Sequence, residues 1–296
     1  MVAIPKTAFA LLSGSAGWGL RFPDDLAEPG VRVLDRWLTF ETPWGPVDNW
    51  QMLELDGRLT ADGRARQVLN VFSHGWPNDA IDHAAHRRVA WVLAQAGVRK
   101  ALADSTCGSL NKAIQPRDLV IAKDVLDFSQ TQFSGMAGRL RHQALANQLF
   151  CPAMAATLES TARASWPPTA RVFGHGQRVV ATHNWGPRFT SRAEARAYQM
   201  LGGDVINQSI GPEASAMREI GACFASSSFV VCWEDDIVDQ PGESIDRVHH
   251  DLSRIAVRIS LLTLARIDPG EACGCRSLRI ERAPEYASFA PDATRR

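Results

Sequence analysis

The sequence predicts a single α/β domain whose mostly parallel sheet is flanked by helices. Two observations support this prediction. Short apolar and β-branched runs alternate along the chain with stretches of helical periodicity, and neither an internal repeat nor a low-complexity linker interrupts them. The 296 residues, 45% of them hydrophobic, are also sufficient to bury a large core.

The expected strands are short runs rich in apolar residues. They lie at residues 9–12, 67–72, 101–104, 119–122, 177–182, 205–207 and 223–231. The expected helices lie at residues 81–96, 154–165, 191–201, 213–220 and 243–265. Residues 127–149 carry Gly, Gln and Ser without clear periodicity, which predicts a long excursion over the surface or against a neighbouring subunit. The chain after Glu281 is rich in Pro and Ala, and we expect it to be a loose tail.

The overall composition excludes several classes of function. The 32 basic and 32 acidic residues balance, so we do not expect a sequence-independent binder of nucleic acid or of an anionic membrane. The sequence has no apolar run long enough to cross a bilayer, and its beginning lacks the features of a signal peptide. Six scattered cysteines are typical of free thiols in a reducing compartment. We therefore expect a cytoplasmic protein.

The cysteine and histidine spacings do not predict a metal site. Cys273 and Cys275 form the one close pair, and two thiols are too few ligands for a metal ion. His83 and His86 lie three residues apart on one face of a predicted helix, but no acidic residue stands at a familiar ligand spacing.

Polar residues directly after the predicted strands are the candidates for a functional site, because sites in open α/β sheets form at the carboxyl ends of strands. Residues with a hydroxyl, amide or imidazole group follow several of these strands beside small neighbours, and the candidates are Ser15, His74, Ser105 with Thr106, and Ser209. Taken singly, each has a plain alternative, such as a tight turn around Ser15 or a structural role for a lone His74. Taken together, they predict a small polar ligand with an anionic part.

Two further loops contain residues suited to a planar or basic ligand. Phe189 lies at a sharp turn, where an aromatic ring can stack on a planar base. Thr190 or Ser191 can then cap the following helix, and Glu194 fits a capping box. The acidic run after the strand at 223–231 is equally consistent with general acid–base chemistry and with a solvated loop.

In order along the chain, these loops resemble the trimeric purine nucleoside phosphorylases, and methylthioadenosine phosphorylase most of all. The resemblance extends over residues 9–265. Its most specific stretches are TPWG at 42–45, CGSL at 107–110, IQPRD at 114–118, GPRF at 186–189, RAE at 192–194, GDVIN at 203–207 and PE at 212–213.

The resemblance implies the nucleoside phosphorylase fold, a mixed and mostly parallel twisted sheet, over residues 1–280, with a tail at 281–296. It implies a homotrimer or a dimer of trimers. The implied reaction is phosphorolysis: inorganic phosphate attacks the anomeric carbon of a purine nucleoside, such as 5′-methylthioadenosine or a related modified nucleoside. Free base and sugar 1-phosphate are the products, and no metal or organic cofactor is expected.

The resemblance also implies roles for individual positions. The phosphate-binding positions are Ser15, Ser73, His74, Ser105, Thr106 and Ser209, and the nucleoside-binding positions are Phe189, Ile206, Asn207 and Gln208. Base recognition and catalysis fall on the run from Val231 to Glu234, with Cys232 and Glu234 as the candidate residues.

Several of these positions depart from the family pattern. Ser73 replaces an Arg, which removes a bidentate phosphate donor and a positive charge. Gln208 replaces a Met under the ribose, and Trp185 replaces a Glu. Cys232 replaces the Asp that handles purine N7, and a thiol is a poor proton relay, so Glu234 or Asp235 can take over that role.

Two alternative functions follow from these departures. The loss of the Arg at Ser73 is consistent with a nucleosidase that uses water in place of phosphate. A catalytically weak nucleoside-binding or partner protein is the other alternative. The hydroxyl and imidazole groups retained at Ser15, His74, Ser105 and Ser209 count against this last interpretation.

Overall fold

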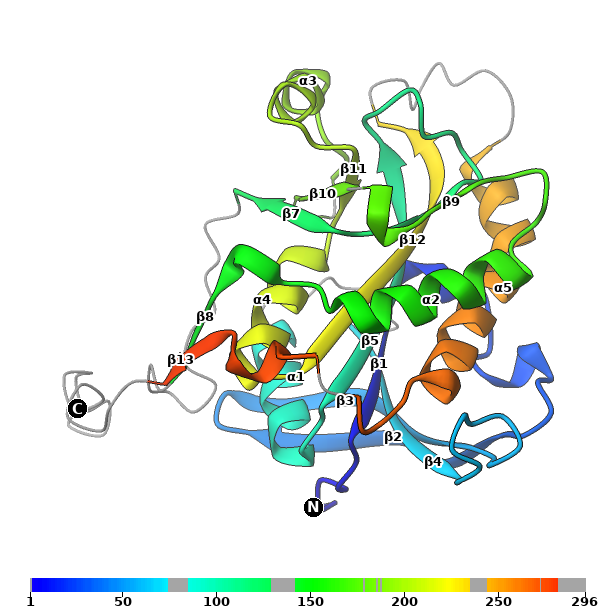
Figure 1. Cartoon of the computed structure of the whole chain (residues 1–296), viewed down its shortest axis with the longest axis vertical. Coiled ribbons are helices and arrows are strands. Elements are labelled where there is room, and N and C mark those ends of the chain that lie inside the picture. The colour runs from blue at the N-terminus through cyan, green and yellow to red at the C-terminus, as the bar shows by residue number, and fades with distance from the viewer. Residues whose placement is uncertain are drawn as a thin grey trace.

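The computed structural model describes residues 2–73, 85–128, 142–177, 179–184, 186, 188–234, 244–271 and 273–281. Within these ranges an 11-stranded mixed sheet forms the centre of the molecule (Figure 1). Its main path runs β2-β3-β4-β1-β5-β11-β10-β7, and β12, β6 and β9 branch from β5. The prediction of a single α/β domain with a mixed sheet is confirmed.

The strands of this sheet have the following bounds. They are β1 (Phe9–Ser13), β2 (Val31–Thr42), β3 (Gly45–Leu55), β4 (Arg66–Phe72), β5 (Lys100–Ser109), β6 (Leu119–Ile121), β7 (Asp124–Asp127), β9 (Val172–Phe173), β10 (Val180–His183), β11 (Val205–Asn207) and β12 (Cys223–Trp233). A second, two-stranded sheet pairs β8 (His142–Ala144) with β13 (Arg279–Glu281). The helices are α1 (Ala85–Ala96), α2 (Pro152–Ser165), α3 (Arg192–Met200), α4 (Ile210–Ile220) and α5 (Ile245–Arg266).

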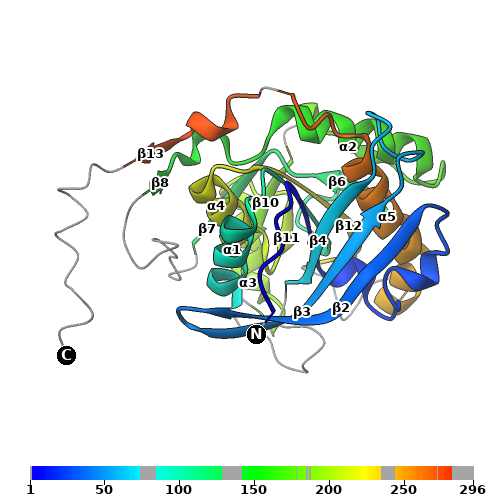
Figure 2. The same cartoon turned by 90° about the horizontal axis from the view of Figure 1, so that it is seen from below.

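The helices cover both faces of the sheet, as Figure 2 shows. Alternate residues of β1 point to opposite faces, because successive side chains of a strand alternate. Ala10 and Leu12 join the core cluster that contains α1 and α4, whereas Phe9 and Leu11 join the cluster that contains α2 and α5. Since both faces are buried, β1 is apolar from Phe9 to Leu12.

The predicted elements are present with small shifts of their ends. The strand predicted at 101–104 extends over the ten residues of β5, and the strand predicted at 177–182 begins only at Val180, after a short 3-10 helix at His175–Gln177. Helix α1 begins at Ala85 in the described part of the chain, since residues 74–84 lie outside it. Ser191 caps α3 and forms a capping box with Glu194, so the prediction for this helix start is confirmed.

The sequence patterns missed the long hairpin of β2 and β3. Its pairing shifts register between Val33 and Asp35, again before Leu38 and again before Phe40. Each shift interrupts the alternation of apolar and polar residues from which a half-exposed strand is recognised. Exposed charged residues on β2 further weaken the apolar pattern.

The segment predicted to run over the surface is described only at its two ends. Asp127 ends β7, and from His142 the chain forms β8, which pairs antiparallel with β13 near the end of the described chain. Residues 129–141 and the tail at 282–296 lie outside the described residues. Among the helices in the described ranges, none is long and apolar enough to cross a membrane.

Candidate active site

The predicted phosphate-binding residues converge where β1, β4, β5 and β11 meet. Strands β1, β4 and β5 run parallel, so Ser15 and Ser73 follow neighbouring strand ends. Strand β11 runs antiparallel to β5, with Ile206 opposite Gly108. This direction carries Asn207 back toward Ser105 and Thr106, which lie within β5 rather than after it.

Ser15 is joined directly to Thr106. The Ser15 and Thr106 hydroxyl oxygens lie 2.8 Å apart, and the backbone N–H of Thr106 donates to Ser15 Oγ at 2.9 Å. Gly14 makes this contact possible, because a Cβ at that position would lie 2.4 Å from the carbonyl oxygen of Asp104. The turn after β1 therefore lies directly against β5.

Asn207 links the remaining loops through both ends of its side-chain amide. Its Nδ2 donates to Ser105 Oγ at 2.6 Å, and its Oδ1 accepts from the backbone N–H groups of Ser209 at 2.8 Å and Ile210 at 2.9 Å. Ser105 Oγ in turn lies 2.6 Å from Ser228 Oγ on β12. Asn207 thus positions the start of α4, whose N-terminus favours an anion.

Ser73 stands at the position where the resemblance places an Arg. Its side chain is buried and forms a hydrogen bond with the carboxyl group of Glu213. Its Oγ donates to Glu213 Oε1 at 2.8 Å, and its backbone N–H donates to the carbonyl of Ser13 at 2.9 Å. Glu213 lies on the first turn of α4 and is itself 3% exposed. The sequence pattern had included Glu213 in the resemblance without assigning it a role.

Two buried carboxyl groups, those of Glu213 and Asp104, lie beside the hydroxyl cluster, which is the group formed by Ser15, Ser105, Thr106 and Ser209. Burial raises the pKa of Glu213 to about 7, and the nearby charge of Asp104 acts in the same direction, against hydrogen bonds from Ser73 and Ser209. Burial likewise raises the pKa of Asp104 to about 6, although the N–H of Gly14 donates to Asp104 Oδ1 at 3.1 Å. Low-dielectric surroundings disfavour the ionised forms, so both groups hold protons more tightly than they do in water.

A β-bulge reorients the residues at the end of β12. The pairing of β12 with β5 skips Val231, so that Cys232 lies opposite Gly108 and Trp233 opposite Ser109. Cys232 consequently packs in the apolar cluster that contains α5 and is 1% exposed. Burial, assisted by the charge of Glu234, raises the pKa of the Cys232 thiol to about 12. Cys232 is a neutral thiol at neutral pH.

Glu234 lies over Gly108 and reaches the loop before α3. Its Oε1 accepts from the backbone N–H of Thr190 at 2.9 Å, and a Cβ on Gly108 would come within 2.3 Å of its Oε2. The carboxyl group is buried, and its backbone N–H donates to the carbonyl of Ser109. Glu234 therefore connects β5, β12 and the Phe189 turn.

The predicted nucleoside-binding residues differ in their surroundings. Phe189 is 57% exposed, and Gln208 Nε2 donates to the carbonyl of Arg188 at 3.4 Å. Ile206 is buried against Leu110 and Ala195. Contact of these side chains, and of Asn207, with a nucleoside stays a prediction. His74, Trp185 and Asp235 lie outside the described residues.

A model of the Phosphorylase superfamily matches residues 30–265. The chain belongs to this superfamily. It is 27% identical over 249 residues to the 6-oxopurine nucleoside phosphorylase of Pyrococcus furiosus, covering 80% of this chain and 88% of the relative. It is 28% identical over 281 residues to the S-methyl-5′-thioadenosine phosphorylase of Pyrococcus horikoshii, covering 92% and 96%. The probable S-methyl-5′-thioinosine phosphorylase of Methanopyrus kandleri is also 28% identical, over 253 residues, covering 84% and 92%.

Solved structures of this superfamily have the same fold. A methylthioadenosine phosphorylase from an Antarctic soil metagenomic library superimposes with a TM-score of 0.68, at 21% identity over 88% of this chain and 87% of that one. The methylthioadenosine phosphorylase of Schistosoma mansoni in complex with adenine gives a TM-score of 0.64 at 23% identity, covering 88% and 91%.

Because the pKa of Glu213 is raised in the folded protein, we expect the free energy of unfolding to fall as pH increases. An unfolded Glu ionises at about pH 4.5, so the folded state binds this proton more tightly. The stabilisation is fully present below about pH 4.5 and is lost as pH rises through about 7, by about 3 kcal/mol in total.

We expect Glu213→Gln to flatten this dependence, because an amide still accepts from Ser73 and does not titrate. Urea denaturation between pH 5 and pH 8 measures the slope. Glu41→Gln, which changes an exposed carboxylate of β2, serves as the control and should keep the slope of the original protein. An unchanged slope in Glu213→Gln would contradict the assignment.

Proposed function

We propose that this enzyme cleaves the N-glycosidic bond of a purine nucleoside by phosphorolysis, releasing free base and sugar 1-phosphate. The observation that carries the proposal is the convergence of Ser15, Ser105, Thr106 and Ser209 around the Asn207 amide. The matched curated relatives described above are phosphorylases by name, which supports phosphate as the second substrate.

The proposed role of the hydroxyl cluster is to hold phosphate beneath the ribose. Cleavage of the glycosidic bond passes through an oxocarbenium-like transition state. A phosphate oxygen held close to the anomeric carbon lowers the entropic barrier and places negative charge where positive charge develops. Hydroxyls and the N-terminus of α4 can donate to phosphate from fixed positions, because Asn207 holds the backbone around them.

Because Ser73 stands where the resemblance places an Arg, we expect the affinity of this site for phosphate to be modest. An Arg contributes a bidentate, charge-assisted pair to a phosphate, whereas Ser73 gives its hydroxyl to Glu213. Two buried carboxyl groups nearby add negative charge whenever they ionise. The protons on Glu213 and Asp104 favour anion binding, so phosphate affinity should be greatest where these groups are neutral.

At the base end, we assign recognition of the purine to Glu234 rather than to Cys232. The Cys232 thiol is neutral and packed in an apolar cluster, so it cannot relay a proton efficiently. The Glu234 carboxylate is held by Thr190 beside the Phe189 turn, where a base would stack. The names of the relatives give different nucleosides, namely 6-oxopurine nucleosides, S-methyl-5′-thioinosine and S-methyl-5′-thioadenosine. We propose 5′-methylthioadenosine or a related modified nucleoside as the substrate of this enzyme.

The proposal also covers the cofactor requirement, the oligomeric state and the cellular compartment of the enzyme. Catalysis should require phosphate as co-substrate and neither an organic cofactor nor a catalytic metal. A homotrimer, or a dimer of trimers, would complete the 5′ side of the pocket from a neighbouring subunit. Six free cysteines support a reducing compartment such as the cytoplasm.

Purine release measured with and without phosphate tests this function. Methylthioadenosine, adenosine and inosine are the substrates, and the products are followed by chromatography. We expect release that depends on phosphate and yields sugar 1-phosphate. Release that is indifferent to phosphate would identify a nucleosidase, which the missing Arg at Ser73 would explain. The absence of release from every nucleoside would favour a binding protein.

Substitutions at the end of β12 test the assignment of the base site. We expect Glu234→Gln to reduce kcat/KM by about 100-fold, the typical loss when one acid–base group is removed. Cys232→Ala should leave kcat/KM within about three-fold, because its thiol only packs. Steady-state kinetics on folded proteins, checked by circular dichroism, measure both. Equal losses in the two variants would contradict the assignment.

A further inference from the structure

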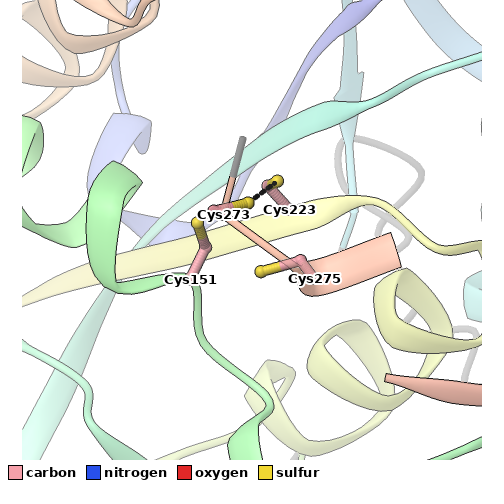
Figure 3. A group of neighbouring side chains, drawn as sticks. All are labelled: Cys151, Cys223, Cys273 and Cys275. Atoms are coloured by element: carbon pink, nitrogen blue, oxygen red, sulfur yellow. Dashed lines mark hydrogen bonds between the residues drawn. The ribbon is translucent and has the colours of Figure 1, made fainter. Parts of the chain in front are cut away.

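Four of the six cysteines come together at the end of the sheet where β12 begins, away from the hydroxyl cluster. The Sγ atoms of Cys151, Cys223, Cys273 and Cys275 all lie within 4.8 Å of one another (Figure 3). Three of the four are buried, and Cys273 is partly exposed. The sequence offered only the pair Cys273 and Cys275, which has too few ligands, whereas the fold adds two more thiols.

The four thiols come from three parts of the fold. Cys151 immediately precedes α2, and its backbone N–H donates to the carbonyl of Phe224 at 2.7 Å, which draws it to the start of β12. Cys223 is the first residue of β12. Cys273 and Cys275 follow α5 and are separated by Gly274, whose φ of +70° is a left-handed conformation. That bend allows both thiols to face one point, and other residues adopt it only with strain.

We propose that these four cysteines form a tetrahedral structural site for Zn²⁺. In a tetrahedron with Zn–S bonds of about 2.3 Å, neighbouring sulfur atoms lie about 3.8 Å apart. The mutual distances in the cluster, all below 4.8 Å, need only small adjustments to reach this geometry. Tetrahedral sites made only of sulfur are typical of zinc and of iron–sulfur centres, and four thiolates around a single ion are a common structural zinc site.

The surroundings also suit a negatively charged metal centre. Binding releases the four thiol protons to solvent, so Zn²⁺ with four thiolates carries a charge of about −2. Arg218 is fully buried, and its Nη1 donates to the carbonyl of Cys275 at 2.8 Å. Its Nη2 donates to the carbonyls of Gln148 and Leu149, just before Cys151, and among the described residues it has no carboxylate partner. A buried, unpaired cation is costly unless a negative group compensates it.

A second buried cation lies at the same end of the sheet. Lys100 is paired in register with Cys223 on the neighbouring strand. Only 4% of Lys100 is exposed, and its Nζ donates to the carbonyl of Glu271, two residues before Cys273. Two cations beside four thiols are the arrangement that would stabilise a tetrathiolate centre.

The place of the cluster indicates a structural rather than a catalytic role. Cys223 and Trp233 are the opposite ends of the 11-residue strand β12. At about 3.3 Å per residue, the cluster lies roughly 30 Å from the residues at the Glu234 end. A metal there would fasten the segment after α5, including β13, to the beginnings of β12 and α2.

Disulfide formation is the alternative to metal binding for the same four cysteines. The closest sulfur atoms, those of Cys223 and Cys273, lie 3.0 Å apart, beyond the S–S bond length of about 2.05 Å. All four sulfur atoms lie within 4.8 Å of one another, so a single ion can contact all of them.

Metal content of the purified full-length chain tests the proposal. The protein is produced without a histidine tag, dialysed against Zn²⁺ and then against metal-free buffer, and analysed by inductively coupled plasma mass spectrometry. We expect about one zinc per chain. Denaturation and alkylation without reductant should then modify all six cysteines, and a zinc chelator should lower the melting temperature by several degrees, reversibly on adding Zn²⁺.

Two variants and a spectroscopic probe make the test specific. The double substitution Cys273→Ser with Cys275→Ser should lose the zinc, whereas Cys107→Ala, which removes a buried thiol outside the cluster, should retain it. If the double variant does not fold, Co²⁺ uptake by the original protein gives an independent signal, since tetrahedral thiolate-bound Co²⁺ is strongly coloured. Zinc uptake below about one-tenth per chain, four cysteines protected as disulfides, or iron in place of zinc would each overturn the proposal.

Discussion

The side-chain amide of Asn207 is the interaction on which the rest of the site depends. It joins β5 to the start of α4, because Nδ2 donates to Ser105 while Oδ1 accepts from Ser209 and Ile210. Without it, the hydroxyl-bearing backbone around Ser105 and Ser209 would have no common anchor. Strand β11 makes the contact possible by running antiparallel to β5, which returns Asn207 to the middle of that strand. Strands β10 and β7 run in the same direction as β11, so the reversal of direction between β5 and β11 is what brings the proposed anion-binding residues together.

Among the described residues of the candidate site, buried carboxyl groups lie beside the hydroxyls that we predict to bind phosphate. The hydroxyl of Ser73 and the carboxyl of Glu213 form a buried hydrogen-bonded pair at the position where the resemblance places an Arg. Since burial raises the pKa of Glu213 to about 7, this carboxyl group is only partly ionised at neutral pH, which would limit its repulsion of the proposed phosphate. At the other end of the pocket, the β-bulge at Val231 places Cys232 in the core and leaves the carboxylate of Glu234 toward the Phe189 turn. Both departures change the electrostatics of the pocket while the fold is kept.

Much of this architecture could be predicted from the sequence, because local patterns determine it. Helix α5 follows from its regular apolar spacing, and α3 from the capping residues Ser191 and Glu194. The β2–β3 hairpin escaped prediction because its register shifts break the alternation. The bonding of Glu213 to Ser73, the burial of Cys232 and the meeting of four distant cysteines depend on tertiary contacts between residues far apart in sequence. No local pattern contains that information, although the resemblance marked the loops in which most of these residues lie.

Phosphate binding to an Asn207→Leu variant tests the central claim most directly. The variant keeps a side chain of similar size but removes the amide that joins the loops, and equilibrium dialysis with radiolabelled phosphate measures its affinity without nucleoside. A matched control is Asn184→Leu, which removes a side-chain amide bonded to Thr190 rather than to Ser105 or Ser209. The account predicts that phosphate affinity falls at least about ten-fold in a folded Asn207→Leu protein, equivalent to about 1.4 kcal/mol, and is retained in the control. Unchanged affinity in the folded Asn207→Leu protein would contradict it.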